Sequence, residues 1–199
     1  RLRRMKKWFK LARHRQSSNR LFTQGMKPAG SYGASVNGMS DKELQLLRRE
    51  TMRGKAPSQG SLTLRLAALG DDCVCEALAP AIMWCRLVWT AITQPAVALM
   101  SIQKLVERWR KAEANTAGTW ARSKGPVDRT ILSLARIKWE VISPMVWQDD
   151  RGYEIRLGHH APKMIIQLMK QAMVRCHEAA AAAHNGHAEG AGCNLEQVQ

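Results

Sequence analysis

Acidic residues are scarce at the start of this chain, which has none in its first 20 residues. The 199 residues include 31 Lys and Arg against 16 Asp and Glu, and the formal charge is +15. Residues 1–65 contribute +13 of that charge. Such an excess of positive charge favours binding to a polyanion, with nucleic acid as the first candidate and an anionic membrane surface as the second. Apolar residues make up 45% of the chain, which excludes wholesale disorder.

The sequence also lacks a disulfide pattern and a long uninterrupted apolar run. Its five cysteines are odd in number and irregularly spaced, and no secretory signal precedes them, so we expect a reducing, intracellular location, nuclear or cytoplasmic. The most apolar stretch, Ala77 to Met100, contains Pro80, Arg86 and Pro95. We therefore expect a buried helix there and no membrane span. The chain starts with Arg1, inside a basic run, which suggests a fragment or a processed product.

Motifs for nucleophilic catalysis and for phosphate loops are missing. The sequence contains no G-x-S-x-G, and the glycines between 25 and 38 fit neither G-x-G-x-x-G nor a P-loop. Late in the chain, five residues have side chains of the types that bind zinc, but their spacing is typical of no zinc site, so we interpret them as surface and tail residues. These residues are Cys176, His177, His184, His187 and Cys193. We expect no metal and no cofactor.

One pair of carboxylates has a superficial likeness to a catalytic site. Asp149-Asp150 follows Trp147, as in the aromatic-x-Asp-Asp hairpin by which polymerases hold magnesium. Arg151-Gly152 comes directly afterwards, and this pattern is typical of a turn. We predict a turn and a non-catalytic chain, with the alternative that both carboxylates are metal ligands.

The apolar spacing predicts a mainly α-helical fold, with six or seven helices and one short β-hairpin. Gly25 to Gly38 is expected to be loop, and the capping box Ser40-Asp41-Lys42-Glu43 should start a helix that ends near Met52. A helix from Pro80 to Thr93 is apolar on nearly all faces and should be central. The other expected elements are helices at residues 1–15, 95–114, 126–143 and 162–184, and a hairpin at 146–157.

Each later helix has an expected core stripe. For helix 95–114 this stripe is Leu99, Ile102, Val106 and Trp109. For helix 126–143 it is Leu132, Ala135, Trp139 and Ile142. For helix 162–184 it is Ile165, Met169 and Met173. Apolar residues that recur every three or four positions lie on one face of a helix, which then packs against the core.

Two groups of cations are candidate phosphate contacts, because sequence-independent nucleic-acid binding depends on Lys and Arg. The first group, in the N-terminal basic segment, is Arg3, Arg4, Lys6, Lys7, Lys10, Arg13, Arg15 and Arg20. The second, on the expected outer face of helix 95–114, is Lys104, Arg108 and Lys111. The alternatives for the first group are a calmodulin-type target helix, a membrane-surface helix and a solvated helix face.

Two stretches carry a resemblance to a known family. The first has Pro28, Tyr32 and Gly33 in a P…YG turn, followed by Leu47-Arg48 in a helix. The second has an ordered set of motifs, namely Trp120, Gly125-Pro126, Leu134-Ala-Arg-Ile-Lys-Trp139, Ser143-Pro144 and Trp147. Together they resemble the thumb and connection region that follows the polymerase palm in non-LTR retroelement reverse transcriptases, of a type abundant as polyprotein fragments in protist genomes.

The residues after the last expected helix (185–199) should form a flexible tail. The resemblance implies that the rest of the chain divides into a basic thumb-like helical segment (1–60) and a helical connection domain (61–184). It also implies a fragment that is not itself an enzyme, from a parent that is an RNA-directed DNA polymerase with its catalytic Asp pair upstream of Arg1. The expected partners are an RNA or RNA–DNA duplex and the polymerase palm. The main alternative is a helical protein–protein interaction module, in which helix 80–93 docks on a partner and the basic helices are only solvated.

Overall fold

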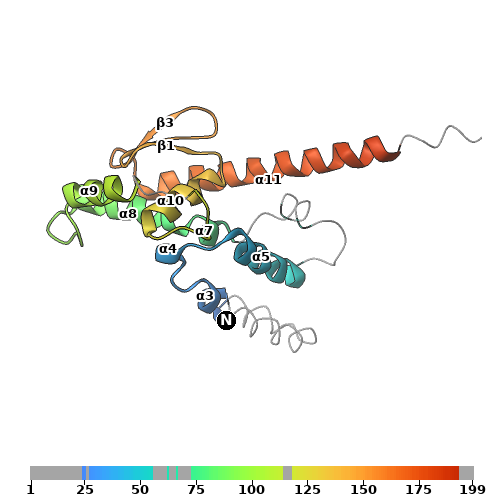
Figure 1. Cartoon of the computed structure of the whole chain (residues 1–199), viewed down its shortest axis with the longest axis horizontal. Coiled ribbons are helices and arrows are strands. Elements are labelled where there is room, and N and C mark those ends of the chain that lie inside the picture. Colours follow the sequence, from blue (N-terminus) through green and yellow to red (C-terminus); the bar gives the residue numbers. More distant parts are fainter. Residues whose placement is uncertain are drawn as a thin grey trace, which may run out of the picture.

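The computed structural model describes residues 24–25, 27–55, 62, 66, 73–113 and 118–192. These residues form a mainly α-helical fold with a small three-stranded antiparallel sheet, which confirms the predicted fold class (Figure 1). The helices are α3 (Lys27–Ser31), α4 (Ala34–Asn37), α5 (Asp41–Lys55), α7 (Val74–Ala77), α8 (Ala79–Thr93), α9 (Ile102–Glu113), α10 (Pro126–Ala135) and α11 (Pro162–Gly192). The strands are β1 (Glu140–Ser143), β2 (Val146–Gln148) and β3 (Glu154–Arg156).

Helix α8 is the centre of the fold, as its all-round apolar character predicted. It packs against α4, α7, α9, α10 and α11. In Figure 1 the sheet lies on one side of α8 and α10, and α3, α4 and α5 lie on the other. The Trp84 ring packs 4.6 Å from the Trp109 ring of α9, centroid to centroid, and its indole N–H donates to the Pro144 carbonyl at 3.0 Å. One side chain thus ties α8 both to α9 and to the loop between β1 and β2.

The capping box at the start of α5 forms as predicted. Glu43 accepts hydrogen bonds from the Ser40 amide at 2.9 Å and the Ser40 hydroxyl at 2.8 Å, and the Glu43 amide lies 3.3 Å from Ser40 Oγ. The helix passes through Gly54 and ends at Lys55, so it is slightly longer than expected. Leu44, Leu47 and Met52 are fully buried.

The segment from Gly25 to Gly38 is not simply loop, contrary to the prediction. It contains the short helices α3 and α4, with Tyr32 and Gly33 as the turn between them. Gly33 has a left-handed φ of +81°, and its carbonyl accepts from the amides of Val36 and Asn37. The turn that was expected at Tyr32-Gly33 is present, and it leads into α4 instead of directly into α5.

Helix α9 starts later than predicted. Pro95 was expected to open it, but residues 95–100 form turns and bends, and the helix begins at Ile102. The Leu105 amide donates to the Ser101 carbonyl at 3.1 Å, which closes the first helical turn. Leu99, part of the expected core stripe, is 84% exposed, whereas Leu105 and Trp109 are the buried residues of this helix.

The helix expected over residues 126–143 ends at Ala135. Lys138 has a left-handed φ of +58°, and the amides of Ile137 and Trp139 donate back to the Leu134 carbonyl, which terminates the helix. Residues 140–143 form β1 instead. The β-branched pair at 141 and 142 suits a strand, and pairing with β2 overrides the helical spacing. The expected stripe was therefore wrong at Ala135 and Ile142, which are exposed.

The hairpin at 146–157 is confirmed, and β1 extends it to three strands in the order β1-β2-β3. Trp147 pairs with Ile155 across β2 and β3, and both are buried. Their neighbours Glu154 and Arg156 are exposed, which is the alternation expected of a sheet with one face on the core. The turn closes at Gly152, whose φ is +87°.

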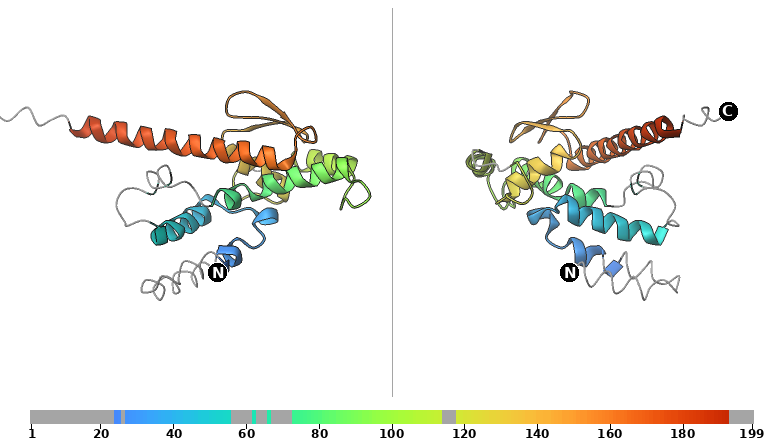
Figure 2. Two further views of the ribbon diagram at one scale, coloured as in Figure 1. Left: turned by 180° about the vertical axis from the view of Figure 1, so that it is seen from behind. Right: turned by 45° about the vertical axis from the view of Figure 1, so that its right-hand side comes forward.

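The last helix, α11, buries Ile165, Met169 and Met173 as predicted. It was expected to stop at Asn185-Gly186, but it continues to Gly192, so residues 185–192 of the expected tail are helical. The C-terminal half projects beyond the other helices in the left view of Figure 2. Among the residues that the structure describes, no helix is long and apolar enough to cross a membrane.

One hydrophobic cluster joins most of these elements. It contains Ala34, Met39, Leu44 and Leu47 together with buried residues of α7 to α11 and the sheet. The predicted division at residue 60 stays a prediction, but residues on both sides of it share this core.

The fold leaves little room for a side chain at Gly38. Its φ of +60° and ψ of −174° lie in a region that is essentially reserved for glycine, and a Cβ there would come within 2.5 Å of Trp120 Cζ3. We expect Gly38→Ala to lower the free energy of unfolding by about 3 kcal/mol. The control is Gly118→Ala. Gly118 also has a positive φ (+67°), but a Cβ there would meet nothing within 4 Å, so this substitution should lower the free energy of unfolding by only about 1 kcal/mol. Equal losses in urea unfolding would contradict the close approach of Trp120.

Candidate nucleic-acid interface

The eight N-terminal cations of the first group lie outside the described residues. These are Arg3, Arg4, Lys6, Lys7, Lys10, Arg13, Arg15 and Arg20. Their assignment as phosphate contacts stays a prediction.

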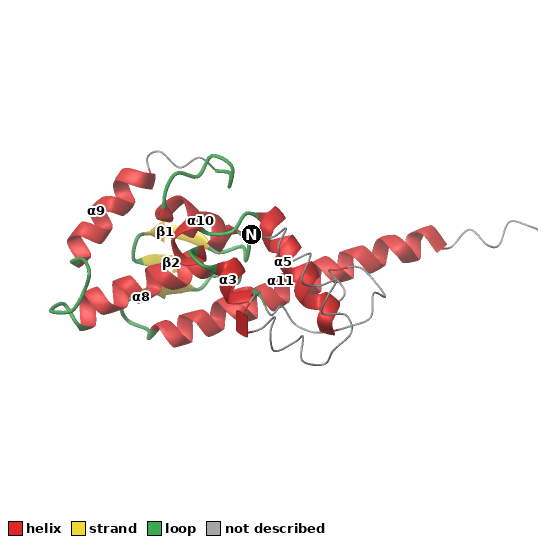
Figure 3. Ribbon diagram, turned by 90° about the horizontal axis from the view of Figure 1, so that it is seen from below, coloured by secondary structure: helices red, strands yellow, loops and turns green. Residues whose placement is uncertain are grey.

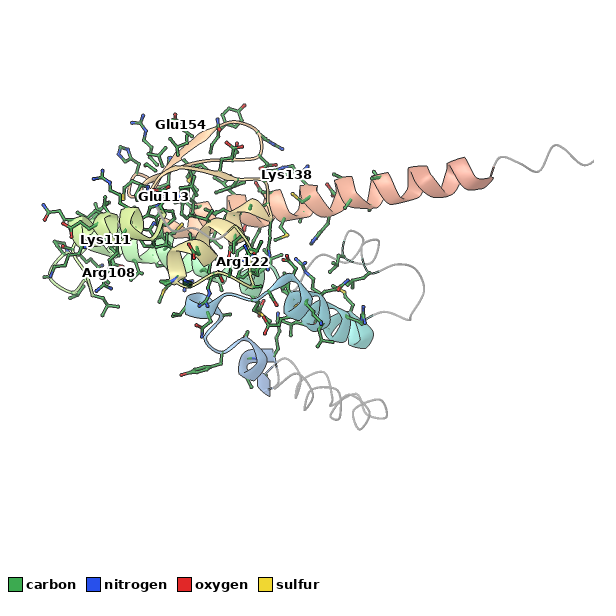
Figure 4. All side chains as sticks on the ribbon, in the orientation of Figure 1. Arg108, Lys111, Glu113, Arg122, Lys138 and Glu154 are labelled. Carbon is green, nitrogen blue, oxygen red and sulfur yellow. The ribbon has the colours of Figure 1, made fainter. Side chains whose placement is uncertain are left out.

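The second group of cations forms a stripe on α9, and this stripe, Lys104, Arg108 and Lys111, is called the α9 stripe below. All three residues are exposed, and their spacing of four and three residues places them on one face of the helix. The buried side chains of Leu105 and Trp109 fix the rotation of the helix about its axis, so that the α9 stripe faces away from the core. Figure 4 labels Arg108 and Lys111 on α9, at the left end of the molecule in that view.

The surface of α9 is mixed in charge. Glu107 lies between Lys104 and Lys111 in the sequence, and Glu113 follows, so two exposed acids accompany the exposed cations. Helix α9 stands at the opposite end of the molecule from the projecting half of α11 (Figure 3). The stripe is thus a local cationic ridge on a helix with a modest net positive charge.

A third group of cations, two of them exposed and one half-buried, was not predicted from the sequence. Arg86 on α8 and Lys163 and Lys170 on α11 line one groove. Arg86 is the only charged residue of α8, and the two lysines are seven residues apart, so each helix alone shows an ordinary amphipathic pattern. Only the packing of α8 against α11 brings these cations together.

The motifs that carry the family resemblance meet around Arg136. Its guanidinium lies 2.8 Å (Nε) and 2.7 Å (Nη2) from Asp41 Oδ1, donates to the Ala77 carbonyl at 2.9 Å and to the Met39 carbonyl, and stacks 4.2 Å from the Trp120 ring centroid. Burial lowers the pKa of Arg136, and the hydrogen bond with Asp41 opposes that shift. These contacts use the guanidinium to hold helix ends, which leaves Arg136 with a structural role.

Four other residues of the second motif set are also internal, whereas Tyr32 of the first motif is 79% exposed. Leu134, Ile137, Trp139 and Trp147 are each at most 3% exposed. The Pro144 carbonyl accepts from Trp84, and Pro126 occupies the first turn of α10. The ordered motifs therefore specify how the helices and the sheet pack, and they place none of these side chains on a binding surface.

The carboxylates Asp149 and Asp150 have separate structural partners. Asp149 Oδ1 accepts from the amides of Arg151 (2.9 Å) and Tyr153 (2.8 Å), which confirms the predicted turn. Asp150 pairs with Arg175 through two hydrogen bonds of 2.7 and 2.6 Å, and it accepts from the Trp139 indole at 3.2 Å. The bond from Arg175 is the main cause of the lowered pKa of Asp150.

No group of three or more His, Cys, Asp or Glu side chains that could hold a metal occurs within the described part of the chain. Of the residues weighed as zinc ligands, Cys176 and His177 are partly buried on α11, and the side chains of His184, His187 and Cys193 lie outside the description. Burial raises the pKa of the Cys85 and Cys176 thiols, which favours the protonated, less reactive form.

Comparisons of the chain with protein-family models, with curated proteins and with solved structures found no match. The retroelement resemblance therefore rests on the motifs quoted above.

The Asp150–Arg175 pair yields a pH-dependent prediction. Because the pKa of Asp150 is lowered in the folded state, the pair contributes its full stability above the ordinary Asp value of 3.8 and loses it as the pH falls through the folded-state pKa. We expect Asp150→Asn to lower the free energy of unfolding by about 2 kcal/mol at pH 7, and by less at pH 3.

Urea unfolding at pH 7, 5 and 3 measures this difference. The control is Glu154→Gln, which removes an exposed ion pair with Arg156 of 3.7 Å and should cost less than about 0.5 kcal/mol at every pH. If the Asp150→Asn difference stayed constant from pH 7 to pH 3, the ion pair would not be its source.

Proposed function

We propose that this chain is a non-catalytic, nucleic-acid-gripping part of a retroelement reverse transcriptase, corresponding to its thumb and connection region. Its ligand is an RNA or RNA–DNA duplex, held through the phosphate backbone by basic helices. Its protein partner is the polymerase palm of the same polyprotein, and its location is intracellular, nuclear or cytoplasmic.

The observation that carries this proposal is the α9 stripe, presented on a helix whose other face is anchored by Leu105 and Trp109. With a rise of about 1.5 Å per residue, Lys104 to Lys111 spans roughly 10 Å, a length over which a duplex presents about six phosphate charges. Three cations on a rigid ridge of this length suit the backbone of a duplex. The formal charge of +15 supports the same ligand class through long-range attraction.

The geometry of the two carboxylates supports the non-catalytic part of the proposal. Asp149 closes a turn and Asp150 is held by Arg175 and Trp139, so both are committed to contacts within the protein. A two-metal site needs carboxylates that are available to the ions. The hairpin that carries them serves the fold.

Neutralising the α9 stripe tests the proposal. We expect the triple variant Lys104→Gln, Arg108→Gln and Lys111→Gln to bind an RNA–DNA duplex more weakly in low salt. The slope of log K against log salt should fall by up to about 3, because each lost phosphate contact removes roughly 0.9 from it. Fluorescence anisotropy at several KCl concentrations measures both quantities.

The matched control removes three exposed cations from other surfaces, with the same change in net charge. This control is Arg122→Gln, Arg151→Gln and Arg156→Gln. It should keep the slope nearly unchanged, since those residues lie on a loop and on the hairpin. Equal losses in the two triple variants would assign binding to net charge alone, and no binding by the unaltered chain in low salt would overturn the proposed function.

A further inference from the structure

Helices α8 and α11 enclose a groove of about 570 Å³ that the proposed function does not use. The floor is apolar and includes Ala79, Ile82, Met83 and Ile166. This volume lies within the roughly 300–1,000 Å³ typical of binding sites. Both helices are anchored in the continuous core, α8 by residues such as Ala81 and α11 by residues such as Ile165, so the walls of the groove are held in place.

Each helix contributes one complete face over two turns. The lining positions of α8 are 79, 82, 83 and 86, and those of α11 after Pro162 are 163, 166, 167 and 170. Both sets follow the spacing i, i+3, i+4, i+7, which is the side of a helix that a partner helix contacts. The groove is therefore a trough between two helices, about 10 Å long.

The charged residues that line the trough all have one sign. Its lining contains Arg86, Lys163 and Lys170 and no acidic residue, and none of these three makes an ion pair with a described residue. Glu76, which follows the lining residue Cys75 in the sequence, is itself paired with Lys27 at 3.3 Å, and its side chain is only 14% exposed. The occupant that complements this surface has an apolar face flanked by negative charges.

We propose that this groove binds an acidic amphipathic helix of a partner protein. Apolar side chains of the partner, spaced i, i+3, i+4, i+7, fill the trough, and its flanking Asp and Glu pair with Arg86, Lys163 and Lys170. A single-stranded nucleic acid fits less well, because the lining has no aromatic ring on which a base could stack. This inference is independent of nucleic-acid binding by the α9 stripe.

Alkylation of a cysteine that lines the groove can report whether the groove is occupied. Cys75 lines the groove and is exposed, whereas Cys73 and Cys85 are buried and Cys176 is half-buried. An occupant should slow alkylation of Cys75 by N-ethylmaleimide, and the modified residue is identified by peptide mass mapping.

The binding test uses the full chain and a fluorescent synthetic peptide with Leu at i, i+3, i+4 and i+7 and Glu at the flanking positions. The groove variant is Arg86→Glu, Lys163→Glu and Lys170→Glu. Its matched control, with the same charge change, is Lys104→Glu, Arg108→Glu and Lys111→Glu on the α9 stripe. We expect the groove variant to bind the peptide at least about tenfold more weakly, and the control to bind it almost as the unaltered chain does.

A second variant tests shape without charge. Gln167→Trp places a bulky ring at an exposed position in the trough, and it should weaken peptide binding about tenfold while the fold, followed by circular dichroism, is kept. Three results would each overturn the proposal. These are equal peptide affinity in the two charge-reversal variants, no protection of Cys75 by the peptide, and stronger protection by a single-stranded RNA than by the peptide.

The two proposals fail separately. The groove variant should keep the affinity for an RNA–DNA duplex within the change caused by net charge, while the α9 variant should lose that affinity and keep the peptide. If the chain binds the peptide but no duplex, the proposed function is wrong and the groove proposal stands.

Discussion

The largely buried guanidinium of Arg136 makes the contacts on which the arrangement of this fold depends. It satisfies the carbonyls of Met39, before α5, and Ala77, at the end of α7, and it pairs with Asp41 in the first turn of α5. Met39 and Ala77 are buried, so their carbonyls lie in a region largely withdrawn from water, where an unpaired polar group is costly. The charge of an arginine persists when it is buried, and its planar fork reaches several acceptors at once. Lysine could not make the same set of bonds.

Trp120 links Arg136 to the segment that precedes α5, because its ring contacts both. Its ring lies between the Arg136 guanidinium and Gly38, and the absence of a side chain at Gly38 permits the close approach. Arg129 of α10 reaches the same segment, with a 3.0 Å bond to Asn37 Oδ1. The buried motif residues that resemble a reverse-transcriptase connection region therefore hold the helices and the sheet together.

Sequence reasoning predicted the features that are encoded locally. The capping box at Ser40, the all-round apolar helix α8 and the Asp149–Gly152 turn each depend on residues close together in the chain. It was wrong at residues 136–143, where helical spacing continued past Ala135 but Lys138 takes a left-handed φ and β1 pairs with β2. The exposed α9 stripe could be predicted from spacing. The groove could not, because Arg86 and the two lysines belong to helices that are far apart in the sequence.

The two cationic surfaces differ in what surrounds their charges, and this difference is the reason why we propose a different ligand for each. On α9 the cations stand on a solvated ridge beside Glu107 and Glu113, which partly offset the local attraction to a polyanion. The proposed binding of a duplex there would depend on direct phosphate contacts. In the groove, Arg86, Lys163 and Lys170 surround an apolar floor that a phosphate backbone would leave in water. Burial of that floor needs an apolar partner, and the cations then select one with acidic flanks. A basic protein can in this way keep a protein-binding site distinct from a nucleic-acid surface, because the apolar floor supplies the affinity that charge alone does not.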